Sequence, residues 1–506
     1  MNNHLFDTLF GGVSSDKLFI QLASGERWSY GDILRETAKV ANALVTAGIR
    51  PGDRVAAQID KSVSAIALYL GTVRAGAVFL PLNTAYTANE IEYFVGDAEP
   101  ALLVCRPAAE TELRPIAEKA NSRLETLAAD GNGGSWAKRV ESGATDFDTI
   151  ERDKDDLVAI LYTSGTTGRA KGAMITHDNL ASNALTLRTL WQFTSNDVLL
   201  HALPIFHTHG LFVATNTVII AGGSMLFLPR FDVEQVISLL PHASVMMGVP
   251  TFYTRLLDQA GFTDELTRNM RVFISGSAPL LEETHVAFQE RTGMAILERY
   301  GMTETNMNTS NPYDGDRRAG TVGFPLPGVD IRITDPDNGM RLPRGEIGML
   351  EVMGPNVFKG YWRMPEKTAE EFRADGYFVT GDLGKYDDQD YVVIVGRGKD
   401  LIISGGFNVY PKEVEIEIDL LPGVIESAVV GLPHPDFGEG VTAVVVARQG
   451  KATDETAIKM QLAGKLARFK QPKRVFFCDA LPRNSMGKVQ KNLLREQYKN
   501  IYLKGL

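Results

Sequence analysis

Apolar and polar residues alternate along the first 150 residues in two different rhythms. Between residues 32 and 44, Ile33, Val40 and Leu44 recur at steps of seven and four, which predicts one face of a helix ending before Gly48. Short apolar runs typical of buried strands stand on either side of further helical stretches. The expected elements are strands over 54–59 and 77–82 and a helix over 64–73. Strands that alternate with helices in this way are typical of parallel α/β units.

The same texture continues to about residue 395. Strands are expected over 157–162, 198–200, 245–247 and 272–274, with a helix over 233–240. From Gly345 the pattern changes to short runs separated by turns, at 346–353, 377–380 and 391–395, which predict antiparallel strands in a distorted barrel or sheet. The glycine-rich stretch 121–150 is predicted to be a surface excursion.

The last 108 residues have the size of one small domain. Strands are expected over 427–431 and 441–446, and a helix begins at Asp454, where acidic residues in the first turn suit the helix dipole. The segment 411–421 is ambiguous because its apolar residues alternate as in a strand, whereas Pro411 suits the first position of a helix. A helix is the favoured interpretation.

Composition narrows the class of protein. Of 506 residues, 44% are hydrophobic and 23% charged, which is typical of a globular chain and excludes disorder as its main state. The net charge of −10 argues against a nucleic-acid-binding protein. Cys105 and Cys478 are the two cysteines, too few for a disulfide framework or a zinc ribbon. We recognise neither a secretory leader nor a membrane span, and expect a reducing, cytoplasmic location.

A loop rich in glycine and hydroxyl residues follows the apolar run 157–162. It reads Thr163-Ser-Gly-Thr-Thr-Gly-Arg-Ala-Lys-Gly172. Glycines let the backbone approach a ligand, successive N–H groups form an anion nest, and Lys171 adds positive charge, which together suit the phosphates of a nucleotide. The loop is not a Walker A motif, because glycine rather than serine or threonine follows Lys171. The plain alternative is a solvated hairpin loop.

Further motifs follow this loop in a fixed order. They are Ser275-Gly-Ser-Ala-Pro-Leu280, Tyr300-Gly-Met-Thr-Glu304, Thr380-Gly-Asp382, Ser404-Gly-Gly-Phe-Asn408 and Pro482-Arg-Asn-Ser-Met-Gly-Lys488. In these motifs the chain resembles the adenylate-forming acyl-CoA synthetases, from about residue 25 to Lys491. The resemblance implies an α/β fold with a large N-terminal domain of mixed α/β sheets plus a distorted β-barrel (1–398) and a small mobile α+β C-terminal domain (399–506), with a hinge at Lys399.

The resemblance also implies a reaction in two halves. A carboxylate attacks the α-phosphate of Mg-ATP and releases pyrophosphate, and the thiol of coenzyme A then attacks the acyl-adenylate. ATP binding is expected of Thr163, Ser164, Gly165, Thr166, Thr167, Gly168, Lys171, Ser275, Gly276, Ser277, Glu298, Tyr300, Gly301, Thr303, Asp382, Arg397 and Lys488.

Catalytic roles are expected for four residues: Lys488, His207, Thr303 and Glu304. Glu304 is a hard oxygen ligand suited to Mg²⁺, and Lys488 would neutralise charge where carboxylate and α-phosphate meet. A coenzyme A-side loop is expected at Ser404, Gly405, Gly406 and Phe407. Taken alone, the Thr-Glu pair would suggest a helix cap and Lys488 a solvated surface charge.

The residue before Tyr300 carries the argument about the acid. Arg299 brings a planar, permanently charged group that suits a short acid with a second carboxylate. Within the family, the strings around Arg299, His207 and Gly405 resemble the malonate-activating members. We therefore expect malonate to bind at Arg299, His207, Ser277 and Met307. The plain alternatives are a structural or surface ion pair for Arg299 and a core histidine for His207.

Other functions remain open at this point. Within the enzyme class, the alternative is a synthetase for another short-chain or aryl carboxylic acid. A carrier-protein-loading module, a light-emitting oxygenase and a nucleotide-binding regulator without turnover share the fold or the nucleotide site. The presence of Lys488, Glu304 and Asp382 argues against the regulator. The expected partners are small molecules (malonate, ATP and coenzyme A), with neither nucleic acid nor membrane.

Overall fold

The computed structural model describes residues 3–163, 170–405, 407–448, 453–463, 465–484 and 487–502. Its chain divides into two compact units: Met1–Asp330 with Met353–Phe378, and Ile331–Val352 with Val379–Leu506. Among the described residues, no helix is both long and apolar enough to cross a bilayer.

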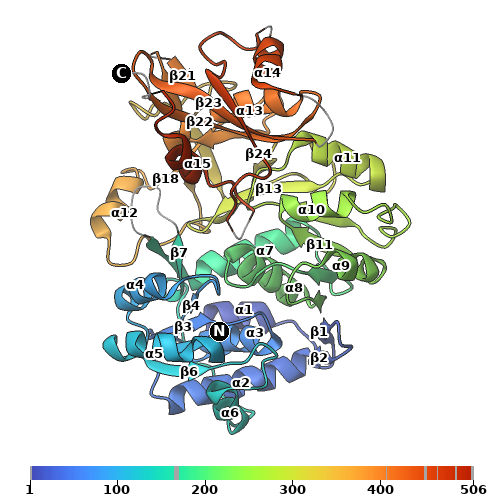
Figure 1. Ribbon diagram of the computed structural model, residues 1–506. Helices are drawn as coiled ribbons and strands as arrows, with labels where there is room; N and C mark the ends of the chain where they lie inside the picture. The colour runs from blue at the N-terminus through green and yellow to red at the C-terminus, as the bar shows by residue number, and fades with distance from the viewer. Residues whose placement is uncertain are drawn as a thin grey trace. The chain divides into compact units, whose positions relative to one another are not determined.

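A six-stranded sheet lies in the first unit (Figure 1). Its strands, in spatial order, are β6 (Arg123–Thr126), β5 (Leu102–Cys105), β3 (Arg54–Gln58), β4 (Val78–Pro81), β7 (Leu157–Thr163) and β8 (Lys171–Thr176). The strands pair in parallel except β7 and β8, which form an antiparallel hairpin. The expected parallel α/β units are thus confirmed.

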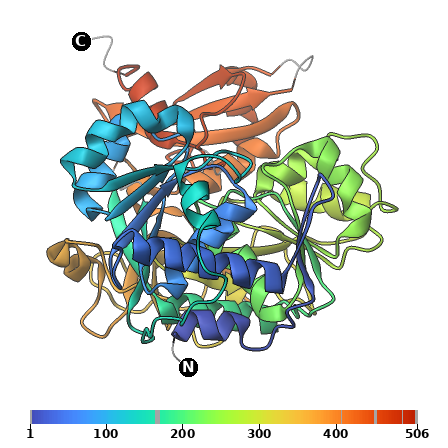
Figure 2. The same cartoon turned by 90° about the horizontal axis from the view of Figure 1, so that it is seen from below.

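Helices connect these strands, and the blue to teal segments of Figure 2 show them against the sheet. They are α2 (Tyr30–Thr46), α3 (Val63–Arg74), α4 (Ala88–Ala98), the 3₁₀ turn η1 (Pro107–Ala109), α5 (Glu110–Lys119) and α6 (Ser135–Glu141). Helix α2 begins two residues before Asp32 because Ser29 caps it and Asp32 bonds back to the Ser29 backbone, a capping box.

The prediction for residues 121–150 was wrong. This stretch supplies the edge strand β6 and the helix α6, and the Trp136 side chain is only 1% exposed. Its glycines hid two short elements whose positions depend on tertiary contacts, chiefly the parallel pairing of β6 with β5.

A nine-stranded sheet completes the first unit. Its order is β15 (Phe324–Pro325), β14 (Asn306–Ser310), β13 (Leu297–Met302), β12 (Val272–Ser275), β11 (Val245–Gly248), β9 (Val198–His201), β10 (Ser224–Phe227), β1 (Leu18–Leu22) and β2 (Arg27–Ser29). The central strands up to β13 are parallel and buried, whereas β14 pairs antiparallel with both of its neighbours, β13 and β15.

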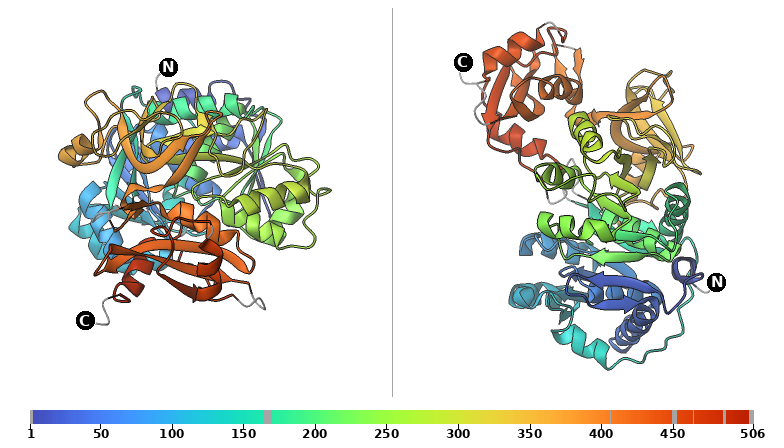
Figure 3. Two further views of the ribbon diagram at one scale, coloured as in Figure 1. Left: turned by 90° about the horizontal axis from the view of Figure 1, so that it is seen from above. Right: turned by 90° about the vertical axis from the view of Figure 1, so that its right-hand side faces the viewer.

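The helices of this region appear mainly in green in Figure 3. They are α1 (His4–Phe10), α7 (His177–Leu190), the π-helical turn η2 (His209–Ala214), α8 (Thr215–Ala221), α9 (Val233–Leu239), the 3₁₀ turn η3 (Leu240–His242), α10 (Pro250–Leu257), α11 (Glu282–Thr292) and α12 (Pro365–Glu371). Helix α1 contacts α3, α7 and α8, so helices attached to both sheets pack together.

The second unit contains two smaller sheets. The first has the order β16 (Asp330–Thr334), β17 (Gly348–Met353), β18 (Phe378–Tyr386), β19 (Val392–Arg397), and is the sheet expected after Gly345. The second has the order β21 (Phe407–Val409), β20 (Ile402–Ser404), β23 (Gly438–Ala447), β22 (Val424–His434), with β24 (Arg474–Cys478) also paired to β23. The 3₁₀ turn η4 (Gly398–Asp400) joins β19 to β20.

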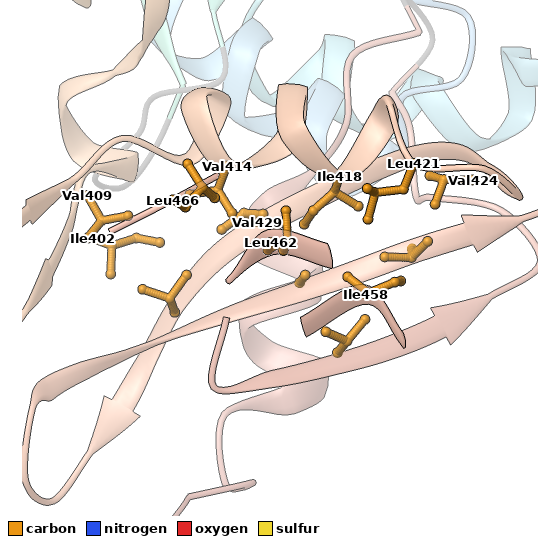
Figure 4. Packing of buried hydrophobic residues seen from close by; sticks show 14 residues of the cluster. Ile402, Val409, Val414, Ile418, Leu421, Val424, Val429, Ile458, Leu462 and Leu466 are labelled. Atoms are coloured by element: carbon orange, nitrogen blue, oxygen red, sulfur yellow. The ribbon is translucent and has the colours of Figure 1, made fainter. Parts of the chain in front are cut away.

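Strands β22 and β23 have apolar side chains on both faces. Val429, Val441, Ala443 and Val445 pack with α13 (Pro411–Asp419) and α14 (Glu455–Leu462), as Figure 4 shows for the labelled members of this cluster. Val430, Leu432 and Val444 pack on the other face with Leu494 of α15 (Lys491–Tyr498). The helix favoured over 411–421 is confirmed, with Pro411 in its first turn.

Candidate functional site

The turn after β12 brings two of the expected motifs together. Strand β13 pairs with β12 so that Glu298 lies opposite Ser275, which brings Arg299 beside the turn. A Cβ atom built on Gly276 would lie 2.5 Å from Cζ of Arg299, so a side chain at this position would collide with the guanidinium. Ser277 has φ 72°, a left-handed conformation that is uncommon for a residue with a side chain and that recurs at functional sites.

Arg299 is a buried cation that has no anionic partner among the residues the structure describes. Its side chain is 2% exposed, and neither Nε nor Nη2 has a hydrogen-bond partner among the described residues. Burial lowers the pKa of Arg299 to about 9, against opposing effects of Tyr253 and Glu298, and leaves it protonated at neutral pH. Both plain interpretations of Arg299 fail within the described part of the chain: it is not at the surface, and it has no ion pair.

Two histidines face the same region. Burial, followed by the charge of Arg299, lowers the pKa of His207 to about 4 and the pKa of His209 well below its usual value. His209 Nδ1 lies 3.1 Å from the hydroxyl of Ser277, and the His209 backbone N–H donates to Nδ1 of His207 over 3.4 Å. Sequence reasoning selected His207 and missed His209, although the His-Thr-His spacing was visible.

The β13–β14 hairpin carries Tyr300, Gly301, Thr303 and Met307. Thr303 lies in the turn between the two strands. A Cβ atom on Gly301 would lie 1.8 Å from the carbonyl oxygen of Asn306 and 2.7 Å from Cε of Met307. Met307 is 1% exposed, which fits its expected place at the depth of a pocket.

Glu304 and Lys171 belong to one polar network. The hydroxyl of Tyr361 lies 3.1 Å from Oε1 of Glu304 and 2.6 Å from Oε2 of Glu371. Lys171 Nζ donates to Oε1 of Glu371 over 2.8 Å and lies 3.9 Å from the centre of the Tyr361 ring. The phosphate-loop lysine and the expected metal ligand are therefore linked through Tyr361 and Glu371, which sequence reasoning missed.

Charges in this network are mutually compensated. Burial raises the pKa of Glu371, but the hydrogen bonds from Lys171 and Tyr361 outweigh it and lower the pKa overall. Among the described residues, no cluster of three or more His, Cys, Asp or Glu side chains could enclose a metal ion. A single buried carboxylate at Glu304 fits Mg²⁺, which binds few carboxylates and completes its shell with phosphates and water.

The expected phosphate loop is only partly described. Thr163 ends β7 opposite Lys171 at the start of β8. Ser164, Gly165, Thr166, Thr167 and Gly168 lie outside the described residues. Ser275 is fully buried, with an Oγ that lacks a partner in the described chain, and Glu298 accepts the backbone N–H of Leu280 over 3.2 Å.

In the second unit, Asp382 and Arg397 form an ion pair. They face each other across β18 and β19, with Arg397 Nε 2.7 Å from Oδ1 of Asp382. The hydroxyl of Thr380 accepts the backbone N–H of Asp382 over 3.0 Å, and the carbonyl of Thr380 accepts from Arg397 Nη1 over 3.3 Å. This arrangement holds the Asp382 carboxylate in one orientation.

Lys488 keeps some of its surface in contact with solvent, although protein groups surround its ammonium, and its backbone N–H donates to Oδ1 of Asn484 over 2.9 Å. Desolvation, followed by repulsion from Arg397, lowers the pKa of the Lys488 ammonium, whereas Asp382 raises it. Lys491, just after the loop, pairs with Glu415 over 2.5 Å.

The hinge and coenzyme A-side residues lie on neighbouring elements of this unit. Lys399 is in η4, and Ser404 ends β20 with 2% exposure. Gly405 has φ 61°, and Gly406 lies outside the described residues. Phe407 is 57% exposed and stacks on Phe469 with ring centres 4.7 Å apart. The boundary at residues 398/399 and the roles of these residues stay predictions.

Family models match both parts of the chain. The AMP-binding enzyme model matches residues 12–362, and the AMP-binding enzyme C-terminal domain model matches residues 413–488. The chain therefore belongs to the AMP-binding enzyme family.

Relatives whose names specify different acids have similar sequence identity to this chain. The malonate–CoA ligase of Arabidopsis thaliana is 33% identical over 99% of this chain and 91% of its own. A feruloyl-CoA synthase of Amycolatopsis is 34% identical over 94% of each. The crystal structure of ATP-bound MatB from Rhodopseudomonas palustris is much nearer: it is 61% identical, with a TM-score of 0.98, over 99% of this chain and 100% of that one.

Proposed function

We propose that the protein is an AMP-forming malonate–CoA ligase. It joins malonate to coenzyme A and converts ATP to AMP and pyrophosphate. The observation that carries the proposal is the buried guanidinium of Arg299, whose Nε and Nη2 have no partner among the described residues. The malonate–CoA ligase relative supports the same substrate.

Malonate needs such a group because it has two carboxylates at neutral pH. One becomes the acyl group, while the other keeps its charge in the adenylate and in the thioester. The two unpartnered atoms of Arg299, Nε and Nη2, form one edge of the guanidinium, which can donate two parallel hydrogen bonds to a carboxylate. Neutral His207 and His209 add hydrogen-bonding capacity without a competing charge.

The first half-reaction forms a mixed anhydride. An oxygen of the free carboxylate attacks the α-phosphorus, and the bond to pyrophosphate breaks. Mg²⁺, when bound, supplies positive charge to the phosphates, and Glu304 is the residue that would hold it. Thr303 donates a hydroxyl toward the α-phosphate, Asp382 accepts from the ribose hydroxyls, and Lys488 offsets the charge of the transition state.

The second half-reaction transfers the acyl group. The thiol of coenzyme A, having lost its proton, attacks the carbonyl carbon and AMP leaves. Ser404, Gly405 and Phe407 belong to the loop proposed for this step, with rotation at Lys399. The cytoplasmic location expected from the sequence stays a proposal.

A panel of acids tests the substrate. Purified enzyme is given ATP, coenzyme A and malonate, methylmalonate, acetate, benzoate or ferulate, and the thioester is identified by mass. Malonyl-CoA is the expected main product. With Arg299→Ala, we expect the kcat/KM for malonate to fall by about 100-fold or more, because a charge-assisted bidentate contact is lost, while the KM for ATP changes little.

Arg268→Ala is the matched control. Arg268 is a surface arginine whose side chain is 76% exposed, so its loss should leave both constants unchanged. Preference for acetate or an aryl acid by the unmodified enzyme would refute the proposal. Unchanged malonate kinetics in Arg299→Ala would refute the role of the arginine.

A further inference from the structure

A lysine is buried in the first unit without an acidic partner. Lys61 precedes α3 and is 9% exposed, and it forms no ion pair with any described residue. Its Nζ lies 2.9 Å from Nδ1 of His201 and 2.8 Å from the His201 carbonyl oxygen, and 4.3 Å from the centre of the Phe227 ring. Because burying an amine is costly, these contacts call for an explanation beyond stability.

The ring of His201 connects Lys61 to the backbone of the π-helical turn. Nε2 lies 2.9 Å from the carbonyl oxygen of Gly210. A carbonyl can only accept, so Nε2 carries the proton, and Nδ1 of the neutral ring accepts from Lys61. Thr215 donates its hydroxyl to the same carbonyl over 3.0 Å. Side chains therefore satisfy a buried carbonyl of η2.

This turn carries a residue of the acid site. Its first residue is His209, whose Nδ1 lies 3.1 Å from the hydroxyl of the strained Ser277. Short π-helical turns are rare and recur at functional sites. Gly210 also packs so closely that a Cβ there would lie 2.0 Å from the carbonyl oxygen of Pro204. The turn is thus held at His209 by Ser277 and at the next residue, Gly210, by its close packing against Pro204.

We propose that Lys61 and His201 are positioning residues for acid recognition: through Gly210 they hold the π-helical turn and so set the place of His209. They touch neither substrate nor reacting atoms in this scheme. The inference rests on the proposed function in that the region around Arg299 and His209 binds the acid.

The experiment separates acid binding from stability. In Lys61→Met the side chain stays unbranched and matches lysine as far as Cε, but it loses the terminal amine and with it the donor. We expect the KM for malonate to rise about tenfold, because a small displacement of a positioning group is enough for such a loss. The KM for ATP should stay within about twofold of its original value, and the melting temperature should be equal or higher because a buried amine is removed.

His201 supplies a rescue test that does not depend on the folding of Lys61→Met. His201→Gln retains one acceptor and one donor on the same group, whereas His201→Leu has neither. We expect Gln to keep most of the malonate affinity and Leu to lose it. Tyr69→Phe is the control: it removes a buried hydroxyl 3.3 Å from Asn216, outside the chain of contacts to Gly210.

The outcomes decide between the claims. If Lys61→Met and His201→Leu lower the melting temperature but leave the KM for the acid unchanged, the two residues are merely structural and the inference is wrong. If Gln and Leu behave alike, the hydrogen-bond relay is wrong. Should the unmodified enzyme prefer another acid of the panel, the proposed function fails, and the KM for that preferred acid still tests the relay.

Discussion

Arg299 in the first unit and Arg397 in the second show two ways of using a guanidinium. Arg397 is paired with Asp382 at 2.7 Å and also donates to the Thr380 carbonyl. Arg299 is more deeply buried, yet its Nε and Nη2 have no partner among the described residues. The paired arginine orients a carboxylate that belongs to the protein. In the proposed function, the other presents its unpartnered donors to an anion from outside.

The difference has an energetic meaning. A buried charge without hydrogen bonds costs several kcal/mol, so a site with an unpaired cation is less stable than it could be until an anion arrives. Part of the binding energy of the ligand then comes from relieving that cost. Arg397 offers no such gain, because its partner is permanent.

Gly276→Ala should displace the Arg299 guanidinium, and we expect it to have the largest effect of these variants. The new methyl group would lie 2.5 Å from Cζ of Arg299, so the guanidinium must move. We expect the kcat/KM for malonate to fall by about 100-fold, as for any displaced specificity group, and to fall further than the kcat/KM for ATP. Gly261→Ala, where the added atom meets nothing within 4 Å, is the control. Unaltered malonate kinetics in Gly276→Ala would contradict the account of Arg299.

Arg397→Met should remove the ion pair with Asp382, and we expect a smaller effect. Asp382 would remain but lose its orienting partner, so we expect the KM for ATP to rise about tenfold while the KM for malonate stays constant. Arg344→Met, which removes an exposed ion pair with Asp390, serves as the matched control. If malonate rather than ATP binding suffers in Arg397→Met, the two arginines do not differ as described.

Asp419 extends the comparison of buried charges to a carboxyl group. Burial raises the pKa of Asp419 to about 7, although the hydroxyl of Ser427 donates to its Oδ1 over 2.7 Å. The folded state therefore takes up a proton between the ordinary pKa of 3.8 and about 7, and stability falls as pH rises through that window.

Asp419→Asn removes this dependence. We expect the variant to be more stable than the original at about pH 8, by on the order of 1–2 kcal/mol after allowance for partial exposure, and the gain to shrink toward about pH 5. Urea unfolding followed at several pH values measures it, with the exposed Asp436→Asn as control. A gain that is constant with pH would show that Asp419 is ionised throughout.

Periodicity predicted the elements that bury one clear face. The helix α2 and the strands β3 and β4 lie where the apolar spacing put them, because local pattern and tertiary burial agree there. The helix α13 was ambiguous by pattern and was settled by Pro411. Residues 121–150 failed because β6 exists only through its pairing with β5, which a local pattern does not contain.

The site was predictable where chemistry lies in short strings. Arg299, Glu304 and Lys171 could be selected as candidates because each stands in a recognisable motif. Tyr361 and Glu371 were missed because they join Glu304 and Lys171 only in space, from an unremarkable stretch far along the chain. The need for glycine at position 276 could be recognised only from the fold, because Arg299, which a side chain there would meet, belongs to another strand.

The sheet formed by β22 and β23 is apolar on both faces, so hydrophobicity alone does not choose its alignment. A shift by one residue would exchange valine for valine between the two cores. Polar exceptions break this near-symmetry: Ser427 reaches Asp419, and Thr442 lies 2.8 Å from the hydroxyl of Tyr502. Moved to the opposite face, either hydroxyl would lose its partner. Two small polar side chains thus specify one strand register among several that hydrophobicity alone would allow.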